Sequence, residues 1–279
     1  MNTNQEIKEI VKQKYAEIAT QGKIENMTSC CGSGGCTTEV YNIMTDSYEN
    51  MEGYNPEADL GLGCGLPTEF AKIKEGSIVV DLGSGAGNDA FVARSITGPT
   101  GKVIGVDFTD AMIHKARQNA EKLGFHNVEF RHGDIEDLPL SDDSTDIVVS
   151  NCVLNLVPDK PKAFAEIYRV LKTGGHFSIS DIVLQGELPK GLQTAAEMYA
   201  GCVAGAIQKE EYLQILEETG FQNIQIQKEK AIIIPDDILK EYLTAEQMKM
   251  YNENKNIIFS ITVYGEKKPT SCCGTECCA

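Results

Sequence analysis

Short apolar runs alternate with helix-like stretches through the middle of the chain. The predicted strands cover residues 77–82, 102–107, 128–131, 146–150 and 176–181, and the predicted helices between them cover residues 91–96, 110–123 and 161–171. Strands that alternate with helices predict a parallel sheet with helices on both faces. Right-handed crossovers then bring the carboxyl ends of the strands to one edge, where such sheets bind ligands.

The pattern changes on both sides of this block. Apolar residues recur at helical spacing over residues 7–18, which predicts an amphipathic helix lying on an apolar surface. After residue 181 the sequence is helical over residues 188–219, followed by strand-like segments at 223–229 and 257–266. We expect these two strands to form an antiparallel pair at the sheet edge, and residues 185–207 to cover the ligand.

The predicted fold class is therefore α/β: a Rossmann-like, doubly wound, mostly parallel sheet with an antiparallel edge pair and an added cover. Four segments follow from the pattern. They are an N-terminal helix with a Cys-rich segment (1–44), a nucleoside-binding core (45–184), the cover with the edge strands (185–267) and a Cys-rich tail (268–279).

Composition narrows the class of protein. Hydrophobic residues make up 42% of the 279 residues, which excludes a wholly disordered or fibrous chain. The net charge of −16 repels polyanions and argues against nucleic acid as a partner. The apolar runs are too short to cross a bilayer, and residues 4–20 are too polar for a signal segment. We expect a cytoplasmic protein that does not bind a membrane.

The most informative stretch is VVDLGSGAGND at residues 79–89, a strand that ends on an acid and turns through Gly83, Gly85 and Gly87. Glycines let backbone amides approach a ligand closely. The spacing lacks the third glycine of the dinucleotide fingerprint. Because Asp81 beside the loop would repel a pyrophosphate and attract a cation, it favours S-adenosylmethionine over NAD.

Two further strand ends supply the rest of a nucleoside site. Asp107 ends the second strand and is placed to accept both ribose hydroxyls. GDIEDLP at residues 133–139 follows the third strand, where Asp134, Ile135 and Glu136 are candidates to bind the adenine edge. The three motifs DLGSGAG, GVD and GDIEDLP together resemble the cofactor-binding motifs of class I S-adenosylmethionine-dependent methyltransferases. The resemblance implies cofactor contacts from Asp81, Gly83, Ser84, Gly85, Gly87, Asp107, Phe108, Asp134, Ile135, Glu136 and Asn151.

Ten cysteines are many for a chain that we expect in the reducing cytosol. Three stand alone in the body: Cys152 follows the fourth strand, and Cys64 and Cys202 lie among glycines in segments expected to fold over the cofactor. A buried cysteine is often only a small apolar side chain. Three thiols that converge on one cleft suit a soft, thiophilic acceptor instead. None of the four histidines follows the fourth strand, so a histidine base finds no support, although Glu or Asp could still serve as a base.

GLGCG, NCVLNL and GCVAGA, which contain these cysteines, resemble segments of the arsenite S-adenosylmethionine methyltransferases. The resemblance implies that Cys64, Cys152 and Cys202 hold trivalent arsenic, as arsenite or a methylarsenical, and that the chain works as a monomer. It also implies an upstream redox cysteine, for which Cys30, Cys31 and Cys36 are all candidates.

Thiolate-bound trivalent arsenic keeps a lone pair, so it can attack a methyl carbon without losing a proton. Methylation formally oxidises arsenic, so a thiol reductant such as glutathione or thioredoxin is expected. The tail cysteines Cys272, Cys273, Cys277 and Cys278 are accessory candidates, and their spacing does not match a zinc site. Two alternatives stay open: a methyltransferase for a small molecule, lipid or quinone, and a non-enzymatic protein that sequesters metalloids.

Overall fold

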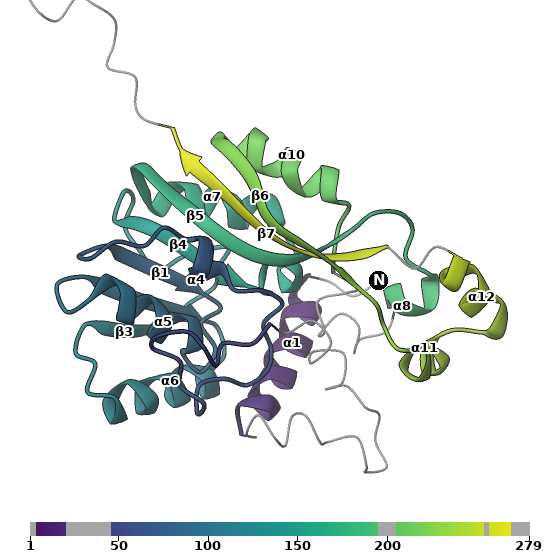
Figure 1. Ribbon diagram of the computed structural model, residues 1–279, viewed down its shortest axis with the longest axis horizontal. Coiled ribbons are helices and arrows are strands. Elements are labelled where there is room, and N and C mark those ends of the chain that lie inside the picture. Colours follow the sequence, from purple (N-terminus) through teal and green to yellow (C-terminus); the bar gives the residue numbers. More distant parts are fainter. Residues whose placement is uncertain (1–3, 21–45, 195–204, 254–256, 269–279) are drawn as a thin grey trace, which may run out of the picture.

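The computed structural model describes residues 4–20, 46–194, 205–253 and 257–268. Its described strands form one seven-stranded sheet in the order β3-β2-β1-β4-β5-β7-β6 (Figure 1). The strands are β1 (Ile78–Leu82), β2 (Lys102–Asp107), β3 (Val128–His132), β4 (Thr145–Asn151), β5 (Leu171–Leu184), β6 (Phe221–Ile232) and β7 (Ile258–Lys267). Strands β1 to β5 run parallel. The predicted fold class is confirmed.

Helices cover both faces of the sheet. One layer holds α4 (Pro67–Phe70), α5 (Asn88–Thr97) and α6 (Asp110–Lys122), and the other holds α7 (Lys160–Val170) and α10 (Lys209–Thr219). Alternate strand residues face the two layers: Val79 packs with Phe91 of α5, while Val80 packs with Phe164 of α7. The short 3₁₀ helix Leu154–Leu156 follows β4. The strand order reverses direction between β1 and β4, so the loops that follow these two strands lead to opposite faces of the sheet. Such a point leaves a crevice at the carboxyl ends of the strands.

The edge strands pair as predicted, but β5 is longer than the predicted strand at residues 176–181. β7 pairs antiparallel with both β5 and β6. β5 extends to Leu184 because β7 pairs with it along that length, down to Leu184 opposite Ile258. Pairing with a distant segment therefore decides where this strand ends.

The predicted helix over residues 188–219 is not continuous. The described parts are α8 (Lys190–Thr194) and α10, and residues 205–208 between them are not helical. The backbone here is bonded to the end of β5, since Leu184 N donates to Ile207 O at 2.9 Å. The Ile207 carbonyl, used in this way, fixes an extended connection instead of a helical turn.

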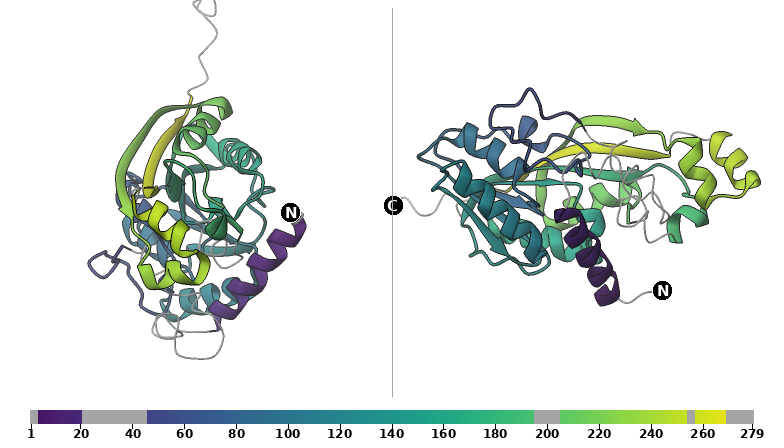
Figure 2. Two further views of the ribbon diagram at one scale, coloured as in Figure 1. Left: turned by 90° about the vertical axis from the view of Figure 1, so that its right-hand side faces the viewer. Right: turned by 90° about the horizontal axis from the view of Figure 1, so that it is seen from below.

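Two further helices, α11 (Asp236–Tyr242) and α12 (Ala245–Glu253), lie with α8 beyond the carboxyl ends of the strands (Figure 1). Their apolar side chains join a separate buried cluster that includes Cys64, Cys152, Leu192, Leu239 and Tyr251. The N-terminal helix is confirmed as α1 (Asn4–Ala19), which packs beside α6 (Figure 2). Among the described helices, none is long and apolar enough to cross a membrane.

Candidate active site

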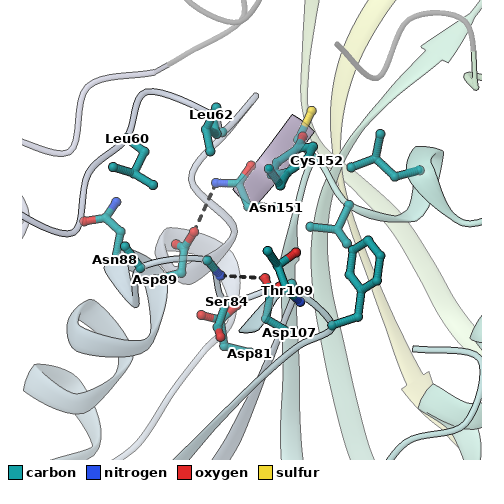
Figure 3. Close-up of a pocket in the computed structure, with 18 of the residues that line it drawn as sticks. Leu60, Leu62, Asp81, Ser84, Asn88, Asp89, Asp107, Thr109, Asn151 and Cys152 are labelled. Carbon is teal, nitrogen blue, oxygen red and sulfur yellow. Dashed lines mark hydrogen bonds between the residues drawn. The ribbon is translucent and has the colours of Figure 1, made fainter. Parts of the chain in front are cut away.

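A pocket of about 1060 Å³, counting its open mouth, lies at the carboxyl edge of the parallel strands (Figure 3). Most of the predicted cofactor residues line it, and so does Cys152. They are Asp81, Gly83, Ser84, Gly85, Asp107, Phe108, Asp134, Ile135 and Asn151. Gly87 and Glu136 do not line it: Gly87 begins α5 under the loop, and the Glu136 carboxylate faces Lys8. None of the four histidines is a lining residue.

Asp81, at the end of β1, lines this pocket with a carboxylate that has one unsatisfied oxygen. The residue is 2% exposed, and its Oδ2 has no hydrogen-bond partner among the described residues. Burial raises the pKa of Asp81 well above its ordinary value, and the carboxylates of Asp89 and Asp107 raise it further. Burying a carboxylate oxygen without a hydrogen-bond partner costs free energy. A cationic ligand in the pocket would remove that cost.

Asp107, at the end of β2, is held by the glycine loop. Gly85 N donates to its Oδ2 at 3.0 Å, and Thr109 N donates to its Oδ1 at 2.8 Å. Burial raises the pKa of Asp107, and these two backbone bonds oppose the shift. The loop turns through glycines with φ of +66°, +50° and +100° at Gly83, Gly85 and Gly87, which other residues rarely adopt. The loop therefore fixes the direction of the carboxylate.

Other polar atoms around the pocket also lack partners. Ser84 Oγ, Asn88 Oδ1 and Thr109 Oγ1 are buried and make no hydrogen bond in the described part of the chain, and all three residues line the pocket (Figure 3). Buried polar atoms in folded proteins are normally satisfied. Their concentration here, with Asp81, marks the binding surface of a polar ligand.

Asn151, the last residue of β4, connects this pocket to Cys64. Its Oδ1 accepts from Cys64 N at 3.0 Å, and its Nδ2 donates to Gly65 O at 2.9 Å. The same Nδ2 lies 2.5 Å from the Tyr48 hydroxyl and 3.1 Å from Asp89 Oδ2. Asn151 thus holds the Cys64 loop against the strand that carries Cys152.

Glycines allow the Cys64 loop to come this close. A Cβ on Gly63 would lie 2.7 Å from Asn151 Nδ2, and one on Gly65 would lie 2.5 Å from Ser180 Oγ. The backbone of Cys64 is held on its other side as well, because Ser260 Oγ donates to Cys64 O at 2.5 Å. The loop backbone on each side of Cys64 therefore lies directly against the side chains of Asn151 and Ser180.

Cys152 follows Asn151 with a strained backbone. Its φ is +60°, an uncommon value for a residue with a side chain, and its amide donates to Ser180 O at 2.7 Å. Strain of this kind persists only where surrounding bonds enforce it, and it often occurs at functional sites. Figure 3 shows the sulfur of Cys152 at the far side of the pocket from Asp81 and Asp107.

Cys64 and Cys152 are buried thiols outside any disulfide, and they belong to one apolar cluster. Burial raises the pKa of Tyr212 well above its ordinary value, and the nearby groups of Asp181, Cys64 and Cys152 raise it further. The third predicted thiol, Cys202, lies outside the described residues, as do Cys30, Cys31, Cys36, Cys272, Cys273, Cys277 and Cys278. In the described part alone, no group of three His, Cys, Asp or Glu could hold a metal ion.

A buried polar group lies next to the thiols. Asp181 in β5 accepts from Asn155 Nδ2 at 2.7 Å and from the Tyr212 hydroxyl at 3.4 Å. Burial raises the pKa of Asp181 to about 7, against the opposing charge of Lys160. This carboxylate lies on the α10 side of the sheet, where Tyr212 donates to it.

Tyr48 and Asp89 are among the pocket residues that sequence reasoning missed. The Tyr48 hydroxyl lies 2.9 and 2.8 Å from the two Asp89 carboxylate oxygens. Burial raises the pKa of Asp89 to about 6, and its bonds to Tyr48, Asn151 and Thr68 oppose the shift. An acid directly after the glycine loop was a usable signal for Asp89. Tyr48 lies in a segment without periodicity and gave none.

Comparison with known proteins agrees with this geometry. A methyltransferase-domain family model matches residues 73–220. An arsenite methyltransferase of Aquipseudomonas alcaligenes is 33% identical to the chain, over 84% of this chain and 68% of that protein. The chain belongs to the arsenite methyltransferase family. Another member, from Halobacterium salinarum, is 42% identical over 238 residues, which are 80% of this chain and 59% of that protein.

A solved structure of the family shares the fold. The arsenic(III) S-adenosylmethionine methyltransferase of Chlamydomonas reinhardtii superposes with a TM-score of 0.63 at 36% identity, over 75% of this chain and 68% of that one. The present chain therefore has the class I methyltransferase fold. The part of the Halobacterium relative that this chain matches is 59% of that protein's length.

Proposed function

We propose that the protein transfers the methyl group of S-adenosylmethionine to trivalent arsenic held by cysteine thiolates. One observation carries the proposal: the pocket that contains the unpartnered Oδ2 of Asp81 also has Cys152 in its wall, and Cys152 packs in one cluster with Cys64. A cation site at one end and thiols at the other correspond to a sulfonium donor and a thiophilic acceptor.

The donor fits the groups that surround the pocket. Asp81 would accept from the ammonium of the methionine portion, and Asp107 would accept from the ribose hydroxyls. Asp134 and Ile135 line the part of the pocket next to β3 and would bind the adenine edge. Bound S-adenosylmethionine would supply a methyl group on a positively charged sulfur.

The acceptor fits the thiols. Cys64 and Cys152 would each form an arsenic–sulfur bond, with Cys202 as the proposed third ligand. When arsenite binds, each arsenic–oxygen bond that breaks releases water formed from a hydroxide and a thiol proton. The apolar cluster around the two described thiols excludes water from the arsenic, which favours the transfer.

In the transfer, the arsenic lone pair forms a bond to the methyl carbon while the sulfonium–carbon bond breaks. The electron pair of that bond stays on sulfur and gives S-adenosylhomocysteine. No proton leaves the acceptor, consistent with a pocket that has no histidine among its described lining residues. Arsenic is formally oxidised to the pentavalent state.

A thiol reductant must then return arsenic to the trivalent state. We propose glutathione or thioredoxin for this role, with one of Cys30, Cys31 and Cys36 as an accessory thiol. The proposed compartment is the cytoplasm, which keeps thiols such as those of Cys64 and Cys152 reduced. We also propose that the chain acts as a monomer.

Methyl-labelled S-adenosylmethionine tests the proposal. The full chain is incubated with the labelled donor and a thiol reductant, with arsenite in one arm and a quinone acceptor in another, and the products are identified. We expect labelled methylarsenic only with arsenite. A methylated quinone would establish the small-molecule alternative, and arsenic bound without methyl transfer would establish sequestration.

Cys152→Ser sharpens the test. We expect this variant to lose arsenite methylation and to bind S-adenosylhomocysteine nearly as well as the unaltered chain, because the thiol contacts arsenic and not the adenosyl group. Full activity in Cys152→Ser would contradict the proposed acceptor.

A further inference from the structure

The N-terminal helix α1 forms part of the wall of the pocket. Lys8 and Tyr15, which are two helical turns apart, both line it. Between them, Val11 is fully buried in the apolar cluster that contains Cys64 and Cys152, and Ile18 is buried against the α5 and α6 layer. One face of α1 therefore lines the pocket and also packs into the apolar cluster that contains the two thiols.

Lys8 carries the polar contact of this face. Its Nζ lies 2.6 Å from Asp134 Oδ2 and 2.8 Å from Glu136 Oε2. The side chain of Lys8 is 29% exposed and that of Glu136 is 11% exposed. Ion pairs that are partly shielded from water are stronger than exposed ones. The pair of bonds joins α1 to the turn after β3.

The turn held by Lys8 is the proposed adenine-binding segment. Within it, Asp134 Oδ1 accepts from Glu136 N at 2.9 Å, and Glu136 Oε1 accepts from Asp159 N at 3.1 Å, just before α7. Without a cation, the carboxylates of Asp134 and Glu136 would repel each other across this short turn. Lys8 thus keeps together three segments: α1, the turn and the start of α7.

The charge of the pocket makes Lys8 stand out. Among the described lining residues it is the single cation, and the lining carboxylates are Asp59, Asp81, Asp89, Asp107 and Asp134. Lys8 is paired with two carboxylates, so its charge is neutralised locally. It therefore does not repel the positively charged sulfonium of the donor. Its role is therefore to hold groups in place and not to bind an anion.

We propose that Lys8 is a positioning residue that fixes the Asp134–Glu136 turn in the shape that selects adenine. The inference rests on the proposed cofactor. With Nζ bound to Asp134 Oδ2, the Asp134 carboxylate faces the pocket in one orientation and can accept from the exocyclic amino group of a 6-aminopurine. A 6-oxopurine would present an acceptor to the same carboxylate and is disfavoured.

The test compares the affinities of S-adenosylhomocysteine and S-inosylhomocysteine, measured by calorimetry on the full chain. We expect Lys8→Ala to weaken the adenine ligand by about tenfold, equal to the loss of one well-placed polar contact, and the inosine ligand by much less. The ratio of the two affinities would fall. Lys8→Arg should restore the ratio because it keeps the charge. Lys12→Ala, which removes a pair to Asp110 at 3.5 Å on the same helix, should leave the ratio unchanged.

The outcomes separate the possibilities. If folded Lys8→Ala binds both ligands more weakly by the same factor, the ratio of their affinities is unchanged. That result would mean that Lys8 only docks α1, and it would overturn the inference. If Lys8→Ala does not fold, Lys8→Gln takes its place. An affinity ratio in folded Lys8→Gln equal to that of the unaltered chain would overturn the inference. Absence of S-adenosylhomocysteine binding by the unaltered chain would overturn the proposed function itself.

Discussion

Replacing Asn151 with leucine should damage arsenite binding more than a comparable loss of hydrogen bonds elsewhere. Asn151 accepts from Cys64 N and donates to Gly65 O, and its Nδ2 also reaches the Tyr48 hydroxyl and Asp89. Leucine has a similar volume and none of these groups. The Cys64 loop would keep its bond from Ser260 and lose its two bonds to Asn151 at the end of β4.

The size of the effect follows from the bonds lost. At about 1 kcal/mol for each neutral hydrogen bond and more for the bond to Asp89, the free energy of unfolding should fall by roughly 3 to 5 kcal/mol. If about 1.4 to 2.8 kcal/mol of this free energy served to hold the two thiols in position, its loss lowers arsenite affinity by about tenfold to a hundredfold.

The assay is calorimetric titration with arsenite, with Asn127→Leu as the matched control. Asn127 Nδ2 donates to Gly98 O at 3.0 Å and to Gly101 O at 2.9 Å, next to the amino end of β3 and away from the thiols. We expect Asn127→Leu to lose stability and keep its arsenite affinity. If both variants lose arsenite affinity to the same extent, the role given to Asn151 is refuted.

Three further predictions concern the carboxylates and one glycine. Asp81→Asn should weaken S-adenosylmethionine at least about tenfold and leave adenosine unaffected. Because burial raises the pKa of Asp81, affinity for S-adenosylmethionine should fall with decreasing pH already above the ordinary carboxylate range, and calorimetry on Asp81→Asn should show a flatter pH profile. The folded pKa of Asp181, about 7, exceeds the ordinary 3.8, so this residue lowers stability as pH rises between these values. Thermal melts should show Asp181→Asn more stable than the parent at pH 8, by at most about 4 kcal/mol, and not at pH 4. A Gly65→Ala side chain would meet Ser180, so arsenite titration should show weaker binding; unchanged affinity would count against the close packing there.

The elements that the sequence predicted well are those with a local signal. The parallel strands carry apolar runs, and the glycine loop with Asp81 and Asp107 follows from two strand ends. The glycines on each side of Cys64 are a local signal as well, since the side chains of Asn151 and Ser180 leave no room there for a Cβ. Local patterns report these features because one segment determines them.

The remaining features depend on distant pairs. Lys8 and Asp134 are 126 residues apart, and Tyr48 and Asn151 are 103 apart, so no local spacing reveals either contact. The length of β5 depends on β7, and the break before α10 depends on a bond to Leu184. Such contacts appear only when the sheet has brought its strand ends together.

X-ray absorption at the arsenic edge tests the central claim most directly, because it identifies the atoms bonded to arsenic. We predict that arsenite bound to the full chain has only sulfur neighbours, that Cys64→Ser and Cys152→Ser each lose a sulfur, and that S-adenosylmethionine adds a carbon neighbour. Oxygen neighbours that persist in the unaltered chain, or a spectrum that S-adenosylmethionine leaves unchanged, would contradict methyl transfer to thiolate-bound arsenic.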